Sequence, residues 1–233
     1  MIRFLLAMAF AWAAVLPVQG ATGDETSAVS EAPKLAGGST QNLAGGVMIV
    51  HTVPELSYTN PQPEGGYCDF CDLTSCDGIK TQVGKEPSVW FVISAWTEPK
   101  VFRAAEFGLG DFDPNLYVFL EHGPCWQQGM AIYHNEERQW PAPNTGIALA
   151  TIGDMYWRGQ FVPMYWFAGY QYQGTGTIPL TKFQGTDHAG WTNPGKLVTQ
   201  YDAACLGALG VGVPGVACCP QAPDTTRTSQ PGQ

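Results

Sequence analysis

The feature that most constrains the fold is a series of short segments rich in β-branched and aromatic residues, separated by glycine and proline. Nowhere does a capped stretch of ten or more residues carry apolar positions at helical spacing. Such segments with turn signals between them are typical of an all-β fold. The sequence therefore predicts a single β-sandwich of about seven to nine strands, immunoglobulin-like or jelly-roll-like, with disulfide-tied loops. The strongest expected strands are 45–53, 89–96, 115–123, 146–153, 161–172 and 177–183.

Two of these segments are apolar on both faces. In VWFVISAW (89–96) and MYWFAGYQY (164–172), apolar residues stand at odd and even positions alike. A strand of this kind is central, with each face covered by other strands or by a loop. Since alternate residues point to opposite sides, we expect Met164 and Trp166 to share one face and Tyr165 and Phe167 the other.

Four segments together resemble a group of uncharacterised secreted bacterial β-domain proteins with a YWFAGY-type aromatic strand. They are GGVMIVHTV (45–53), AEFGLGDFD (105–113), RQWPAPNTGIALA (138–150) and YWFAGYQY (165–172). The resemblance covers most of residues 45–172. It implies a secreted β-domain and brings no assigned function and no catalytic residues.

The N-terminus has the three parts of a secretory signal peptide at residues 1–20. Arg3 precedes an apolar run over residues 4–16, and Val18 and Gly20 provide small residues before a cut ahead of Ala21. The run is shorter than the roughly 20 residues that span a bilayer as a helix. We therefore expect a secreted protein, extracellular or periplasmic, with no transmembrane segment in the mature chain.

The folded part is expected to lie between two segments without hydrophobic periodicity. Residues 21–42 have the composition of a disordered leader or linker, and residues 221–233 that of a disordered tail. Residues 43–220 are long enough for one β-sandwich domain with a real interior. The uncharged stretch 203–220 is broken by glycines and Pro214, so we expect it to be buried or tied by disulfides rather than membrane-embedded.

The charge of the chain excludes nucleic acid as a partner. The formal net charge is −9, and it becomes −10 when Arg3 leaves with the signal peptide. Lys and Arg form no cluster, whereas phosphate backbones require cationic counter-charge.

Seven cysteines predict disulfides, because a secreted chain matures in an oxidising compartment. Three bridges and one unpaired thiol are the simplest arrangement, and the connectivity stays open. In GGYCDFCDLTSC (65–76), the three cysteines are too close to bridge one another comfortably in extended chain. At least one of them is therefore expected to reach Cys125 or the C-terminal group. The candidates are Cys68, Cys71, Cys76, Cys125, Cys205, Cys218 and Cys219.

Two other interpretations of the Cys68–Cys71 pair are weaker. A zinc knuckle needs a second pair at comparable spacing, and the adjacent Cys218 and Cys219 do not provide it. A thioredoxin-like redox motif needs a βαβ context, which this chain lacks.

A calcium site is the one cofactor that the sequence suggests. Asp111, Asp113 and Asn115 stand at alternate positions, like the start of a calcium-binding loop. The pattern departs from that loop at its glycine, where Leu116 stands, and at its final glutamate. The alternative is a turn in which the aspartates bond to their own backbone.

The histidines supply the raw material for an enzymatic alternative. His122 and His134 flank a loop near Glu121, Glu136 and Glu137, and such groups serve in acid–base catalysis or metal binding. Neither an HExxH zinc motif nor a GxSxG nucleophile elbow is present.

Four tryptophans are the candidates for ligand binding. They stand in Gly/Pro-rich or strand-end contexts, where an aromatic ring can stack on a sugar or another flat apolar face. The alternative is that they anchor loops into the sandwich edge. They are Trp126, Trp140, Trp157 and Trp191.

These features favour a secreted non-catalytic β-sandwich module that is structural or binds a ligand, either carbohydrate or a cell-surface protein. One alternative is a secreted hydrolase that uses the loop histidines and carboxylates. Another is an adhesin or extracellular filament subunit that self-associates by strand addition.

Overall fold

Twelve strands and no α-helix are found in the residues that the computed structural model describes, which are 46–126, 129–133 and 140–220. All of these residues belong to one compact unit. The all-β prediction is confirmed, and the expected count of about seven to nine strands was too low. The predicted signal peptide, leader and tail lie outside the described residues.

The first sheet contains the longest strands and is antiparallel throughout. Its order is β1-β3-β8-β5, so β3 and β8 are the central strands. All four correspond to segments predicted from the sequence. They are β1 (Val47–Ser57), β3 (Ser88–Phe102), β8 (Trp157–Gln171) and β5 (Tyr117–Pro124).

The second sheet is made of eight shorter strands, with β4 at its branch point. On one side β4 pairs with β7, which pairs with β6. On the other side β4 pairs with β10 near its start and with β9 at its end. The strands are β2 (Gln82–Val83), β4 (Ala104–Leu109), β6 (Gly129–Tyr133), β7 (Gly146–Thr151), β9 (Gly176–Thr181), β10 (Gly190–Thr192), β11 (Val198–Gln200) and β12 (Ala208–Val211).

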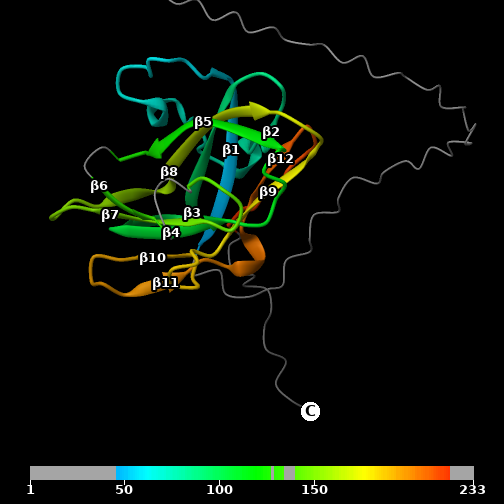
Figure 1. Cartoon of the computed structure of the whole chain (residues 1–233). Helices are drawn as coiled ribbons and strands as arrows, with labels where there is room; N and C mark the ends of the chain where they lie inside the picture. Colours follow the sequence, from blue (N-terminus) through cyan, green and yellow to red (C-terminus); the bar gives the residue numbers. More distant parts are fainter. Residues whose placement is uncertain (1–45, 127–128, 134–139, 221–233) are drawn as a thin grey trace, which may run out of the picture. The chain divides into compact units, whose positions relative to one another are not determined.

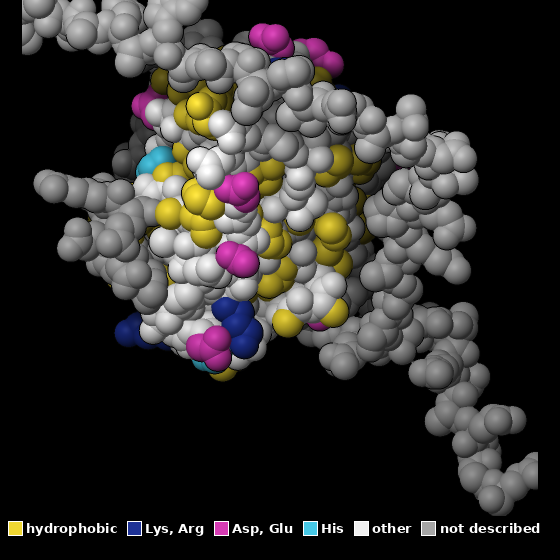
Figure 2. Space-filling model, turned by 45° about the vertical axis from the view of Figure 1, so that its right-hand side comes forward, with side chains coloured by type: hydrophobic (Ala, Val, Ile, Leu, Met, Phe, Trp, Pro, Cys, Tyr) yellow, Lys and Arg dark blue, Asp and Glu magenta, His cyan; other side chains and the backbone are white. Residues whose placement is uncertain are grey.

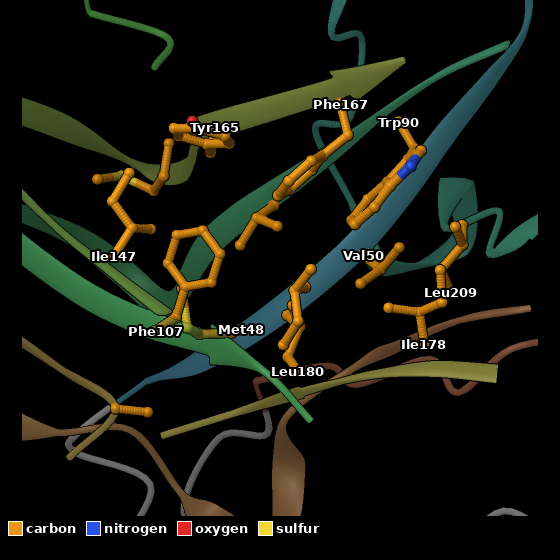
Figure 3. Packing of buried hydrophobic residues seen from close by; sticks show 14 of the residues in the cluster. Met48, Val50, Trp90, Phe107, Ile147, Tyr165, Phe167, Ile178, Leu180 and Leu209 are labelled. Atoms are coloured by element: carbon orange, nitrogen blue, oxygen red, sulfur yellow. The ribbon is translucent and has the colours of Figure 1, made fainter. Parts of the chain in front are cut away.

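The main core fills the space between the two sheets. In Figure 1, β5 and β8 lie above β4, β10 and β11, and Figure 3 shows the side chains between the layers. Trp90 and Phe167 from the first sheet stack with ring centroids 4.2 Å apart. Phe107 and Leu180 approach them from the second sheet, and all four side chains are buried.

The opposite face of the first sheet is covered by a loop. Phe91, Ile93 and Trp166 on this face form a second apolar cluster with Tyr67, which lies in a short 3₁₀ helix (Tyr67–Phe70). The Tyr67 ring packs on Trp166 at 4.7 Å, and its hydroxyl donates to the carbonyl of Thr59 at 2.7 Å. The expectation that the central strands are covered on both faces is therefore confirmed, by a sheet on one side and a loop on the other.

A β-bulge in β8 overturns one expected face assignment. Val92 pairs with Tyr165 while the next residue, Ile93, pairs with Pro163, so Met164 has no partner on β3. As a result Met164 lies in the main core together with Tyr165, and not on the face of Trp166 as strict alternation predicts.

Two disulfides fasten the covering loop to distant parts of the chain. Cys68 is bonded to Cys125 at the end of β5, and Cys76, in the 3₁₀ helix Cys76–Gly78, is bonded to Cys219. The prediction that at least one cysteine of this loop bonds to Cys125 or to the C-terminal group is thus confirmed by both disulfides. Because Cys68 is bridged, the zinc interpretation of the pair with Cys71 is wrong.

The stacked pair at the centre of the main core predicts a large effect of truncation. Phe167→Ala removes a fully buried ring and leaves a cavity, so we expect the free energy of unfolding to fall by about 3–5 kcal/mol. Urea denaturation followed by tryptophan fluorescence measures the change. The matched control is Tyr172→Ala on an exposed ring just beyond the same strand, which should change stability by no more than about 0.5 kcal/mol. Equal effects of the two substitutions would contradict this packing.

Candidate binding face

The structure buries most of the tryptophans that were expected to form an exposed platform. Trp140, Trp157 and Trp191 are only 4%, 5% and 7% exposed and belong to the main core. Trp126 is partly buried and packs edge-on against Trp157 at 6.0 Å. The platform prediction is therefore wrong, because glycine and proline near these residues mark turns that carry the rings inward. The alternative, in which they anchor loops, fits Trp126 and Trp140, whereas Trp157 and Trp191 lie in β8 and β10.

The described residues of the proposed catalytic cluster point to different partners. The Glu121 carboxylate accepts from Tyr58 at 3.0 Å and from Gln62. His122 Nδ1 lies 2.7 Å from the buried hydroxyl of Tyr165, which also accepts from the indole N–H of Trp140. His134, Glu136 and Glu137 lie outside the described residues.

His51 is a structural residue of β1. Its Nδ1 accepts from the backbone N–H of Lys80 at 3.2 Å, which fixes the proton of the neutral ring on Nε2. Nε2 lies 3.1 Å from the carboxylate of Asp72. Burial lowers the pKa of His51, although the hydrogen bond to Asp72 opposes that shift. Both ring nitrogens are engaged, so this histidine ties the covering loop to β1 and is not available as a catalytic base.

The aspartates of the expected calcium loop are held by local hydrogen bonds. Asp113 Oδ1 accepts from the backbone N–H of Asn115 at 2.8 Å and from its side-chain amide at 3.1 Å. Asp111 accepts from Asn144 at 3.3 Å. Within the described ranges, no group of three or more His, Cys, Asp or Glu side chains is placed to hold a metal ion. The stretch is therefore described by the turn interpretation.

A shallow depression lies between β1 and β2. Lys80 is the one titratable residue in its lining. Within this lining Lys80 has no carboxylate or imidazole with which to form an acid–base pair. The other lining residues are Thr52, Pro54, Thr81, Gln82, Val83, Gly84 and Pro214.

The outer side of the second sheet offers a different kind of site. In β4, Ala105, Phe107 and Leu109 point into the main core, so Ala104 and Glu106 point outward. In β7 and β6 the same alternation sends Ala148, Ala150, Met130 and Ile132 outward, and in β10 and β11 it does so for Gly190, Thr192, Val198 and Gln200.

These outward residues stand in register as two rows across five strands, β6-β7-β4-β10-β11. We call the two rows together the outer face. At about 4.8 Å between strands, each row extends about 19 Å. One row is Met130–Ala150–Ala104–Thr192–Val198, and the other is Ile132–Ala148–Glu106–Gly190–Gln200.

The outer face has a floor of small side chains between larger apolar ends. Alanine and glycine occupy most of the centre. Met130 and Ile132 are each 52% exposed at one end, while Val198 and its neighbour Leu197 are 56% and 65% exposed at the other. Another molecule can therefore approach the backbone at Ala104 and Ala150 closely, whereas Gly190 is buried and Glu106 is hydrogen-bonded to Thr186 of this chain.

Glu106 is the one charged side chain in the two rows. Partial burial raises the pKa of its carboxyl group, while a hydrogen bond with Thr186 and the nearby His188 oppose the shift. His188 Nδ1 in turn lies 3.0 Å from Gln200 Nε2, at the end of the same row. The floor thus presents one partly desolvated carboxylate among apolar and small residues.

Charged groups are sparse elsewhere on the surface as well. Figure 2 shows another side of the molecule, on which a few acidic and basic side chains are scattered, some next to each other, and apolar ones reach the surface between them. Scattered apolar residues of this kind are normal for a folded protein. What distinguishes the outer face is that its apolar residues are in register on adjacent strands.

Sequence reasoning missed the outer face because it did not predict four of the five strands that form it. Only β7 was expected, whereas β4, β6, β10 and β11 are short. A signal was nevertheless present in AAEFGL (104–109), where large apolar residues alternate with small ones and one glutamate.

Comparisons with known proteins add little. No family model matches the chain, and no curated protein matches it. Among solved structures, a cohesin module from a family 33 glycoside hydrolase of Clostridium perfringens aligns with 71% of this chain and 97% of its own length. The sequence identity is 10% and the TM-score is 0.40, and we draw no functional inference from this similarity. In the part of the chain that the structure describes, no helix is long and apolar enough to cross a membrane.

The raised pKa of Glu106 predicts a specific pH dependence of stability. The Glu106 carboxyl group stays protonated to a higher pH in the native state than in the unfolded state. Its contribution to the free energy of unfolding is therefore fully present below the unfolded pKa of about 4.5 and is lost as pH rises through the folded pKa. The stability of Glu106→Gln relative to that of the natural chain should therefore be greater at about pH 7 than at about pH 4.

Urea unfolding at both pH values measures this gain. Glu55→Gln, at an exposed position of β1, is the control for loss of one negative charge. A gain at Glu55 equal to that at Glu106 would show that net charge, and not the environment of Glu106, is responsible.

Proposed function

We propose that this chain is a secreted, non-catalytic module that binds a protein partner through the outer face. The observation that carries the proposal is the register of apolar and small side chains across β6, β7, β4, β10 and β11. Exposed apolar surface of this kind, bordered by polar residues, is typical of interaction sites.

The shape of the outer face favours a protein partner over a sugar. Sugar sites generally present an aromatic ring to stack on and several polar groups to orient the hydroxyls. The two rows contain no aromatic residue, and their polar groups are Glu106, Thr192 and Gln200. A flat floor with apolar ends instead suits an apolar ridge of another protein.

Charge complementarity defines the partner further. The chain carries a net charge of −9, and Glu106 presents a partly desolvated carboxylate at the floor. Glu106 already has a hydrogen bond with Thr186 and lies near His188, and a cationic group of a partner would add a charge-assisted hydrogen bond to this carboxylate. We therefore expect a Lys or Arg among the apolar residues of the partner surface.

The non-catalytic part of the proposal rests on the engaged histidine and carboxylate groups. His51, His122 and His188 are each hydrogen-bonded to residues that position them, and the depression between β1 and β2 contains Lys80 alone as a titratable group. Secretion is supported by the signal-peptide pattern at residues 1–20 and by two disulfides, which persist in oxidising compartments.

Selection of phage-displayed random peptides on the folded, oxidised domain tests the proposal. We expect the selected peptides to combine apolar residues with Lys or Arg. Ala150→Lys fills the floor and adds a positive charge, so it should weaken their binding at least about tenfold. Glu106→Gln should weaken the binding of those peptides that carry the basic residue. The control is Tyr172→Lys, a substitution by the same residue at an exposed ring just beyond β8, and this variant should bind the peptides as the natural chain does.

Three results would contradict the proposal. One is peptide binding that Ala150→Lys leaves unchanged. Another is binding on a glycan array without selection of any peptide, which would favour the carbohydrate alternative. The third is concentration-dependent association of the domain with itself in sedimentation, abolished by Ala150→Lys, which would make a second copy the occupant, as the adhesin or filament alternative requires.

A further inference from the structure

A short antiparallel contact brings two cysteines together near the C-terminal end of the domain. Ala208 and Val216 exchange both backbone hydrogen bonds, at 3.1 and 2.9 Å. Cys205 lies three residues before this contact and Cys218 two residues after it. In antiparallel register with this pair, Cys219 stands opposite Cys205 and Cys218 stands opposite Leu206, so Cys205 and Cys218 are one residue out of direct register and lie diagonally across the contact.

The two thiols are in contact. A hydrogen bond joins Cys205 and Cys218, and both side chains pack against the second apolar cluster. Cys218 is only 4% exposed, whereas Cys205, in a short 3₁₀ helix (Ala203–Cys205), is partly exposed. The hydrogen bond lowers the pKa of Cys205, and the same contact together with burial raises the pKa of Cys218.

The third cysteine outside the two disulfides has a different setting. Cys71 follows the 3₁₀ helix of the covering loop, and burial raises the pKa of its thiol to about 11. Its nearest cysteine in sequence, Cys68, is already bonded to Cys125. A thiol of high pKa in an apolar environment is a poor nucleophile.

We propose that Cys205 and Cys218 form a third disulfide in the mature protein, which leaves Cys71 as its single thiol. The bridge closes the chain segment around β12 and ties the C-terminal end of the domain to the second apolar cluster. This proposal does not depend on the function assigned to the outer face.

The reaction is thiol–disulfide exchange with a disulfide oxidant of low molecular mass or on a protein. The Cys205 thiolate attacks one sulfur of the oxidant, an S–S bond forms between them, and the oxidant's other sulfur leaves as a thiolate. The Cys218 thiol then loses its proton, attacks Cys205 and releases the second thiolate of the oxidant. Two protein thiols are oxidised to one disulfide, and one oxidant disulfide is reduced to two thiols. The exposures of the two cysteines set this order, since only Cys205 is open to an oxidant.

Thiol counting on the natural, oxidised chain is the first test. After denaturation in N-ethylmaleimide, we expect one alkylated cysteine per chain, and peptide mass spectrometry should place it at Cys71. Three alkylated cysteines, or alkylation of Cys205 or Cys218, would overturn the proposal.

Variants treated with oxidised glutathione test the order of attack. In Cys218→Ser no second thiol can attack the mixed disulfide at Cys205, so one glutathione should remain attached there. In Cys205→Ser the buried Cys218 should remain unmodified under native conditions. Cys71→Ser is the control and should still form the third bridge. Glutathione at Cys218 but not at Cys205 would contradict the order, and loss of the bridge in Cys71→Ser would contradict the pairing.

Discussion

The pairing of β3 with β8, two strands that are apolar on both faces, is the constraint on which the rest of the structure depends. Neither face of this pair can remain in water, because each carries large side chains such as Trp90 and Phe167 on one side and Phe91 and Trp166 on the other. The second sheet covers one face. The loop from about residue 58 to residue 81 covers the other, although it contains little regular structure.

A covering loop of this kind needs fixed attachments, because irregular chain has few backbone hydrogen bonds of its own. The disulfides to Cys125 and Cys219, the hydrogen bonds of His51 with Asp72 and Lys80, and the Tyr67 ring on Trp166 provide them. Among the described residues, both faces of the first sheet are covered, whereas the outer side of the second sheet is exposed at Met130, Ile132 and Val198. The proposed binding face follows from this arrangement.

The sequence predicts the long strands well, because a two-faced apolar segment has few other ways to fold. It does not predict the short strands, since three or four residues such as those of β10 and β11 carry too little periodic signal. Trp191 is an example of a residue misplaced for this reason. Glycine and proline around it suggest an exposed loop, yet it lies in β10 and points into the core. The outer face was missed for the same reason, because its two rows exist only through pairing between strands that are distant in sequence. The bulge at Met164 likewise depends on register with β3 and not on local pattern.

Hydroxyl-radical footprinting of the folded, oxidised protein tests the central claim most directly, because methionines stand both in the core and on the outer face. Oxidation of a methionine follows the exposure of its sulfur. Met130 is 52% exposed, whereas Met48 and Met164 are fully buried between the sheets. The account predicts rapid oxidation of Met130 and protection of Met48 and Met164 until the protein unfolds. Protection of Met130 equal to that of the two core methionines would contradict an open outer face.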